Sequence, residues 1–194
     1  MASGTVGVDC TMVQVSIANF LNSQRQPMLD FVLSQEQNFH PATIALGSGN
    51  RAVIEAVRRA RILDNLGGFE HLFLNRLQEQ LQPALDRLGH KEFPLGRIEA
   101  QITASNDGDY FRLHQDGGPD DTREISFVYF LHSEPRRFSG GELRIRTETL
   151  SPQGDTLVLF PSVSPHEVLP LTVPSRAFSD SRFTVNGWVH RTRS

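Results

Sequence analysis

A histidine and an acidic residue stand two positions apart in the stretch DYFRLHQDGGPDD, residues 109–121. If this stretch is extended, His114 and Asp116 project from the same face, because side chains on a strand alternate with a period of two. An imidazole and a carboxylate on one face can bind a divalent first-row metal ion. The spacing alone is a weak signal, since about one such match is expected by chance in a chain with seven histidines. Two further matches occur, at residues 90–92 and 132–134, so the pair gains meaning only from other residues.

A third ligand must come from elsewhere in the chain, because one face of one strand supplies only two. His166, in LVLFPSVSPHEVLP, is the best candidate, since it begins an apolar segment after a turn rich in proline and serine. The alternative for a single histidine of this kind is an exposed turn residue. The other histidines are better explained by surface, packing or loop positions, namely His40, His71, His90, His132 and His190.

Two histidines and one carboxylate on a β scaffold make the facial triad that binds Fe(II) and leaves three coordination positions open. Coordination positions that the protein leaves open can bind reactants, so they indicate a catalytic metal ion. A closed structural site would require a fourth protein ligand. Cys10 is the only cysteine, and it lies in an opening segment that we expect to be partly disordered. If 2-oxoglutarate occupied two open positions, its far carboxylate would need a buried cation. Arg182 fits this need at the start of RFTVNGW, although a surface arginine is the alternative.

The composition excludes several classes of protein. The chain has 194 residues and a net charge of -3, which gives no electrostatic footprint for nucleic acid or for an anionic membrane surface. No segment approaches the roughly 20 apolar residues of a membrane span, and the first residues do not resemble a signal peptide. A single cysteine is typical of a reducing compartment, so we expect a cytoplasmic protein. The near-neutral charge leaves a small neutral or anionic substrate open.

The first half of the chain, residues 1–95, is predicted to be mainly helical. Residues 22–39 carry an apolar face and offer Ser23 as an N-cap, with Gln26 three positions further on. This pairing of a serine with a glutamine is typical of a capping box, in which two otherwise unpaired backbone N–H groups receive side-chain partners. The sequence therefore predicts a first helix that begins after Ser23.

A second helix is predicted over residues 68–90, where leucine and phenylalanine recur at steps of three and four. Gly89 is expected to cap its C-terminal end, and Pro83 is expected to kink or divide it. Residues 51–64, between the two helices, fit a helix or a strand equally well.

After Pro94 the pattern changes to short apolar strands separated by turns. They cover residues 97–105, 124–132, 141–146, 155–160 and 182–190. Many strands of similar length without intervening helices predict an antiparallel sandwich or barrel. We therefore predict one α+β domain over residues 1–194. Its core at 96–194 is a jelly roll, or double-stranded β-helix, and residues 1–95 supply supporting helices.

Four segments in order, HQD, FSGGELRI, LVLFPSVSPHEVLPL and SRFTVNGW, resemble the iron- and 2-oxoglutarate-dependent dioxygenases of the prolyl 4-hydroxylase type. The resemblance covers residues 97–191, and the ending SRAFSDSRFTVNGWVHR resembles a bacterial branch of that group. Several strands separate the first ligand from the last in that family, and of the three His-x-acid matches only the one at His114 precedes all of them. The resemblance implies that His114, Asp116 and His166 are iron ligands and that Arg182 binds the distal carboxylate of 2-oxoglutarate.

The same resemblance implies the cofactors and the reaction. The cofactors are Fe(II), 2-oxoglutarate as cosubstrate and O2, with ascorbate as a reductant. The reaction is hydroxylation of a C–H bond in a prolyl residue of a peptide or protein, or in a free amino acid. Asp116 speaks against the halogenating variant, which lacks this carboxylate. Thr184 and Asn186 share a strand face with Arg182 and are expected to line the same pocket, and Tyr129 is expected to hydrogen-bond the cosubstrate.

Three arginines and a tryptophan near the expected site also need an interpretation. Arg123, Arg136 and Arg137 could contact a substrate carboxylate, but solvated loop charges are the more common case. Trp188 is expected to pack in the core.

Two other classes of function stay open. One is a jelly-roll module that binds a structural metal or a small anion without turnover, and the other is a metal enzyme that does not use 2-oxoglutarate.

Overall fold

The computed structural model describes residues 12–45 and 50–193, so Cys10 and the opening segment lie outside the described residues. The helices within these ranges are α1 (Arg25–Ser34) and α2 (Glu70–Leu88). The strands are, in chain order, β1 (Val15–Ala18), β2 (His40–Pro41), β3 (Ile44–Ala45), β4 (Arg51–Ala52), β5 (Arg58–Arg59), β6 (Arg61–Leu63), β7 (Leu95–Ser105), β8 (Tyr110–His114), β9 (Arg123–Leu131), β10 (Ser139–Gly140), β11 (Leu143–Ile145), β12 (Glu148–Leu150), β13 (Thr156–Pro161), β14 (His166–Val168), β15 (Leu171–Thr172) and β16 (Arg182–Arg191).

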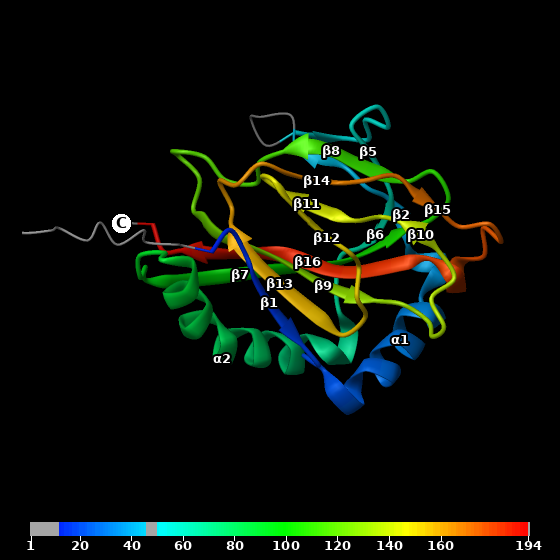
Figure 1. Ribbon diagram of the computed structural model, residues 1–194, viewed down its shortest axis with the longest axis horizontal. Coiled ribbons are helices and arrows are strands. Elements are labelled where there is room, and N and C mark those ends of the chain that lie inside the picture. Colours follow the sequence, from blue (N-terminus) through cyan, green and yellow to red (C-terminus); the bar gives the residue numbers. More distant parts are fainter. Residues whose placement is uncertain (1–11, 46–49, 194) are drawn as a thin grey trace, which may run out of the picture.

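Two antiparallel sheets form the body of the protein. The larger sheet has the strand order β1-β13-β9-β16-β7-β6-β2, and the smaller has the order β12-β11-β14-β8-β5. Figure 1 shows the smaller sheet above the larger one, with both helices below the larger sheet. Two short pairs, β3 with β4 and β10 with β15, lie outside these sheets. Two facing sheets built from distant strands constitute a jelly roll, as predicted.

The larger sheet is buried on both of its faces, and β9 illustrates how the sequence achieves this. Phe127 and Tyr129 join the main core with Phe73 of α2. Phe130, one position further along, turns to the opposite face and joins a second cluster with Leu143 of the smaller sheet. Because side chains alternate across a strand, the same strand thus faces the helices on one side and the smaller sheet on the other.

The long strand β16 pairs along its length with both β7 and β9, at the centre of the larger sheet. A Cβ atom added to Gly187 would lie 1.8 Å from the carbonyl oxygen of Glu99 on β7. Only glycine permits this approach of the two backbones.

Helix α1 begins differently from the prediction. A 3-10 turn at Asn22–Gln24 precedes it, and the expected capping box at Ser23 is wrong, because the N-cap is Gln24 and it forms no side-chain cap. The Asp155 carboxylate instead accepts hydrogen bonds from the backbone N–H groups of Leu21 and Asn22, at 2.7 and 3.0 Å. A partner distant in sequence therefore takes over the role that was expected of a local cap.

Helix α2 runs through Pro83 without interruption, so the expected break is absent from this described helix. Leu81, Ala84 and Leu85 are all buried around the proline, and this packing holds the helix against the sheet on either side of it. The cap at Gly89 is confirmed. Its φ of 59° is left-handed, and its N–H donates to the carbonyl of Asp86.

The stretch 51–64 contains strands and no helix in the described part of the chain, which corrects the mainly helical prediction for residues 1–95. Strand β5 pairs with β8 of the smaller sheet, and β6 pairs with β7 of the larger one. The two halves of the chain are therefore interleaved within both sheets. These pairings are long-range, so the local pattern that fitted a helix and a strand equally well was settled by tertiary structure.

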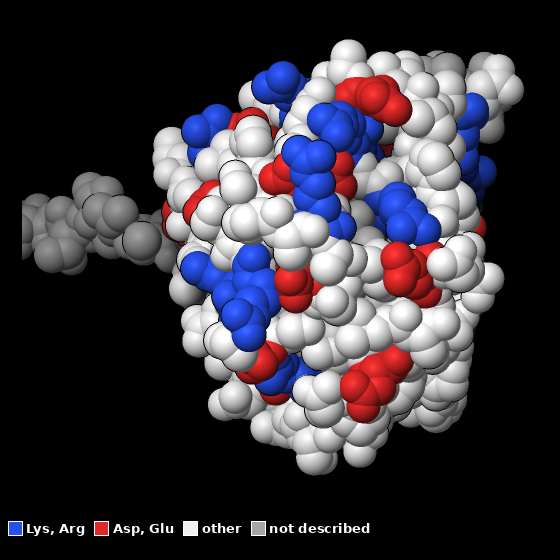
Figure 2. Space-filling view, turned by 90° about the vertical axis from the view of Figure 1, so that its right-hand side faces the viewer, with Lys and Arg blue, Asp and Glu red and all other residues white. Residues whose placement is uncertain are grey.

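Charged side chains are mixed on the surface. Figure 2 shows basic and acidic residues interspersed over one face, without a continuous basic area there. Neither described helix combines the length and apolarity needed to cross a membrane.

Candidate metal centre

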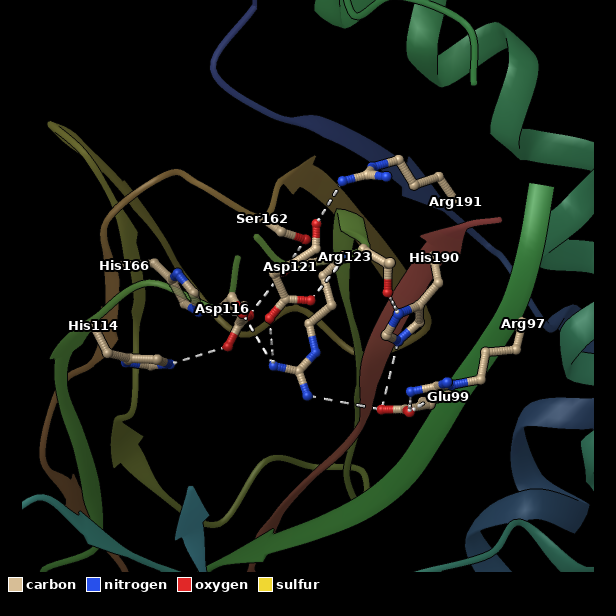
Figure 3. Close-up of polar contacts among 12 residues, drawn as sticks. Arg97, Glu99, His114, Asp116, Asp121, Arg123, Ser162, His166, His190 and Arg191 are labelled. Carbon is tan, nitrogen blue, oxygen red and sulfur yellow. Dashed lines mark hydrogen bonds and ion pairs between the residues drawn. The ribbon is translucent and has the colours of Figure 1, made fainter. Parts of the chain in front are cut away.

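Two neighbouring strands of the smaller sheet bring two histidines together. His166, the first residue of β14, lies opposite His114, the last residue of β8. Asp116 follows β8, and its backbone N–H donates to the carbonyl of Ser162 in the chain that leads to β14. Figure 3 shows the three side chains converging. One ligand atom from each lies within 4.8 Å of the others, which is a spacing that could hold one metal ion.

The hydrogen bonds of the two histidines decide which nitrogen faces the centre. Nδ1 of His114 lies 2.7 Å from the carbonyl oxygen of Arg112, and Nδ1 of His166 lies 2.9 Å from that of Ser164. A carbonyl can only accept, so each Nδ1 must carry the proton and each Nε2 offers a lone pair. The Nε2 atoms are those nearest to Asp116, at 3.6 Å for His114 and 3.2 Å for His166.

The carboxylate between them is held in its ionised form. Burial opposes ionisation of Asp116, but the neighbouring imidazoles of His166 and His114 and the hydrogen bond donated by the Ser126 hydroxyl lower its pKa below the usual range. Burial, reinforced by His166, lowers the pKa of His114 to about 4. A neutral imidazole beside an ionised carboxylate is the protonation state that binds a divalent metal near neutral pH.

A cavity opens beside the triad, between the two sheets. Its apolar wall comes from both sheets and includes Phe111, Leu143, Phe160, Val168 and Trp188. Its polar wall includes Arg58, Thr103, Arg182, Thr184 and Asn186. The cavity thus combines apolar walls with polar and charged groups, among them the two buried arginines Arg58 and Arg182, which is a composition that suits a small-molecule site.

Arg182 enters this cavity from β16 and is only 2% exposed. Its Nε and Nη2 atoms have no hydrogen-bond partner among the described residues, and its side chain forms no ion pair with them. Burial lowers the pKa of Arg182 to about 10, against an opposing influence of Glu142, so the guanidinium is still charged at neutral pH. A buried cation with free N–H groups calls for an anion in the cavity.

A model of the 2OG-Fe(II) oxygenase superfamily matches residues 100–190, the segment that carries the triad and Arg182. The matched segment, residues 100–190, is thus similar to a 2OG-Fe(II) oxygenase domain. Over 136 residues the chain is 38% identical to an uncharacterized PKHD-type hydroxylase of Synechocystis sp., covering 62% of this chain and 45% of that protein. Over 106 residues it is 35% identical to a PKHD-type hydroxylase of Hyphomonas neptunium, covering 50% of this chain and 44% of that protein. The chain thus spans less than half the length of these two curated relatives.

Solved structures share the fold of this chain. A prolyl-4-hydroxylase of Pseudomonas putida superposes with a TM-score of 0.66 at 23% identity, covering 94% of this chain and 95% of that one. The viral collagen prolyl hydroxylase of Paramecium Bursaria Chlorella virus-1, solved as a 2OG complex, superposes with a TM-score of 0.62 at 19% identity, covering 96% and 100%. The jelly-roll class expected from the strand pattern is the fold of these proteins.

Thr184 and Asn186 lie where the alternation along β16 predicts, on the cavity side together with Arg182. Both side chains belong to a hydrogen-bonded group, because the Thr103 hydroxyl donates to Oδ1 of Asn186 at 2.6 Å and the Thr184 hydroxyl does so at 3.4 Å. The larger sheet therefore presents polar side chains to the cavity on the strand face that carries Arg182.

Tyr129 lies on the opposite side of the larger sheet, which corrects the expectation that it hydrogen-bonds the cosubstrate. Its ring packs against Phe20 and Phe73, and its hydroxyl donates to Oδ1 of Asp155 at 3.0 Å. The neighbouring Val128 lines the cavity instead. Both faces of β9 are buried, so apolar content did not reveal which face carries the site.

Trp188 lines the cavity, which corrects the expectation of a core position. The guanidinium of Arg123 lies 4.2 Å from the centre of its ring, and Nη1 of Arg123 donates to the backbone carbonyl of Asp116 at 3.1 Å. Figure 3 shows Arg123 between Asp116 and Glu99. Arg136 and Arg137 are exposed and do not line the cavity.

The histidines of the other His-x-acid pairs, and His190, do not belong to the triad. His132 is buried rather than solvated, and its Nδ1 lies 3.0 Å from the carbonyl of Ser133. His190 is also buried, and its ring bonds to the hydroxyl of Thr122. His90 lies near Glu124 and not near its own sequence partner. Burial of a histidine therefore did not mark the metal centre, whereas strand order did.

Ser126 and Arg58 are among the cavity residues that the sequence did not indicate. Ser126 donates to Asp116 at 2.7 Å, and Arg58 brings a second buried guanidinium into the cavity from β5. Ser126 occupies the same face of β9 as Val128, so knowledge of that face would have found it. Arg58 left no signal, because nothing local to residues 51–64 indicates that β5 pairs with β8.

Proposed function

We propose that the protein is an Fe(II)- and 2-oxoglutarate-dependent dioxygenase that hydroxylates a C–H bond of a prolyl residue or of a free amino acid. One observation carries the proposal: a triad of two histidines and an aspartate opens onto the same cavity as the buried, unpaired guanidinium of Arg182. A metal triad alone would also suit a structural site. The unpaired cation beside it adds a need for an anion, which a dicarboxylic cosubstrate meets.

In this proposal His114, Asp116 and His166 hold the iron. Two imidazoles and one carboxylate are the donors of the facial triad, which leaves positions for other ligands. The Ser126 hydroxyl donates a hydrogen bond to Asp116, and a backbone carbonyl accepts one from Nδ1 of each histidine. These bonds orient the three donors before the metal binds.

Arg182 binds the distal carboxylate of 2-oxoglutarate. Nε and Nη2 form one edge of the guanidinium, and both are without partners, so this edge can donate two parallel hydrogen bonds to a carboxylate. Thr184 and Asn186 line the same cavity as this edge and the triad.

The bound iron supplies redox chemistry that converts 2-oxoglutarate, O2 and a substrate C–H group into succinate, CO2 and an alcohol. Ascorbate is the external reductant in this proposal, and the cytoplasm, which a lone cysteine favours, is the compartment. The chain itself binds and orients the reactants. Phe111 and Trp188 form apolar walls that exclude water and leave room for the hydrocarbon part of a substrate.

The test begins with anaerobic addition of Fe(II) and 2-oxoglutarate to the purified protein. A weak visible absorption at about 500 nm, characteristic of the metal with a bound 2-oxoacid, is expected. His114→Ala should abolish it. Arg182→Gln should raise the concentration of 2-oxoglutarate needed for it, and Arg136→Gln, an exposed control outside the cavity, should not.

Three outcomes separate the alternatives. Metal binding with neither the absorption nor succinate formation would leave a non-catalytic binding module. Oxygen-dependent activity that is indifferent to Arg182→Gln would indicate a metal enzyme without 2-oxoglutarate. The proposed function requires the absorption, succinate formation and the dependence on Arg182 together.

A further inference from the structure

A second arginine of the cavity, Arg58, lies one aromatic ring away from the metal triad. Strand β5 pairs with β8 so that Arg58 stands opposite Phe111. Its guanidinium carbon lies 4.8 Å from the centre of the Phe111 ring, and that ring stacks on His114 with 3.6 Å between the ring centres. The side chain is 8% exposed and lines the same cavity as the triad.

Arg58 has no direct ion-pair partner among the described residues. Among the described residues no carboxylate lies within 4 Å of its nitrogens, whereas the neighbouring Arg59 approaches Asp109 at 3.8 Å. Its one hydrogen bond runs from Nη2 to the hydroxyl of Thr103 at 3.2 Å, and that hydroxyl donates onward to Asn186. Burial lowers the pKa of Arg58 to about 10, with Asp116 opposing, so the group is a cation at neutral pH.

Two buried guanidiniums therefore share one cavity, and they come from opposite sheets. Arg182 belongs to the larger sheet, and Arg58 belongs to the edge strand of the smaller one. Burying a cation without an anion is unfavourable, and a guanidinium with unused N–H groups matches a carboxylate in geometry. One dicarboxylic cosubstrate whose other end occupies the metal accounts for one of the two cations.

We propose that Arg58 binds a free carboxylate of the substrate, so that the substrate is a free amino acid or a C-terminal residue and not a prolyl residue inside a polypeptide. The inference rests on the proposed function and specifies its substrate. The carboxylate pairs with Arg58, and the hydrocarbon part lies along Phe111 and Trp188 beside the triad. An internal peptide bond is neutral and would leave the charge of Arg58 unbalanced.

The experiment compares acids with their neutral counterparts. The twenty common L-amino acids are offered as free acids and as carboxamides, together with the N-acetylated peptide Gly-Pro-Gly as its amide and Gly-Pro as its C-terminal acid. Anaerobic titration of the Fe(II)- and 2-oxoglutarate-loaded protein measures binding through the shift of its visible absorption. Mass spectrometry then scans for a gain of one oxygen.

At least one acid should bind and be oxidised, and its carboxamide should bind about 10- to 100-fold more weakly, the effect of one charged hydrogen-bonded contact. Arg58→Gln should weaken binding of the acid by a similar factor and reduce the preference for acid over amide, with Arg58→Lys intermediate. Arg51→Gln is the matched control. It removes an exposed positive charge that is near enough to Arg58 to influence its pKa, but that does not line the cavity. A free amino acid and the peptide acid, tested separately, distinguish the two sources of the carboxylate.

Three results would overturn the inference. They are equal binding of acids and amides, oxidation of the internal proline only, and the absence of any active acid. A loss of 2-oxoglutarate affinity in Arg58→Gln would assign this residue to the cosubstrate and would also overturn it. Failure of the proposed function looks different, since the wild-type protein would then lack the absorption with Fe(II) and 2-oxoglutarate before any substrate is added.

Discussion

Replacing Arg182 by methionine should make the metal-free protein more stable and at the same time remove its affinity for 2-oxoglutarate. Burial lowers the pKa of this guanidinium to about 10, which corresponds to about 3 kcal/mol of unfavourable burial of its charge at about 1.4 kcal/mol per tenfold change. A methionine fills much of the same space and carries no charge. We expect the free energy of unfolding to rise by about 1 to 3 kcal/mol, the range seen when unsatisfied buried charges are replaced by apolar groups.

The same substitution removes two charged hydrogen bonds to the cosubstrate carboxylate, each worth about 1.5 to 3 kcal/mol. The dissociation constant of 2-oxoglutarate should therefore rise by at least about 100-fold. Urea unfolding of the metal-free protein measures the first effect, and anaerobic titration of the visible absorption measures the second. Arg136→Met, an exposed control, should change neither. A variant that is less stable than the wild type and still binds 2-oxoglutarate normally would refute the reasoning, because Arg182 would then be a structural residue with a partner we have not recognised.

Three further substitutions test the architecture around the site. Ser126→Ala should lower metal affinity about 10-fold, measured by competition with a chelator, because Asp116 loses the hydroxyl that holds it; unchanged affinity would show that the backbone alone positions the carboxylate. Gly187→Ala should destabilise the fold by about 3 kcal/mol or more in urea unfolding, since its Cβ would meet the carbonyl of Glu99. Gly68→Ala is the control and should be tolerated, because a Cβ at Gly68 meets no atom within 4 Å. Equal stability of the two variants would contradict the close approach of β16 and β7. Tyr129→Phe should cost about 1 kcal/mol through the lost bond to Asp155 and leave the affinity for 2-oxoglutarate unchanged; a weakened affinity would restore Tyr129 to the cosubstrate pocket.

Strand periodicity predicted the parts of the site that lie within single strands. His114 and Asp116 came from a spacing of two, and the same spacing on β16 added Thr184 and Asn186 to Arg182, which was chosen as a buried cation at the start of that strand. Trp188 continues that series and could have been found by the same rule, had its aromatic character not suggested the core. The resemblance to a family then selected His114 among three equivalent pairs by the order of strands.

The residues that the sequence could not supply depend on contacts between distant segments. Arg58 reaches the cavity only because β5 pairs with β8, and the segment around it fits a helix as well as a strand. Tyr129 was assigned to the wrong face because both faces of β9 are buried and both carry large apolar side chains. The capping box at Ser23 failed for a related reason, since Asp155 provides the acceptor from more than a hundred residues away.

The separation of the two sheets has a consequence for the choice of cosubstrate. His114 and His166 belong to the smaller sheet and Arg182 to the larger one. If an acid binds as proposed, with one end at the metal and the other at Arg182, the spacing of the facing sheets, about 10 Å between backbones in such folds, limits the chain length that fits. A 2-oxoacid one methylene shorter or longer would reach only one end well, and discrimination among such acids would come from the thickness of the sandwich itself.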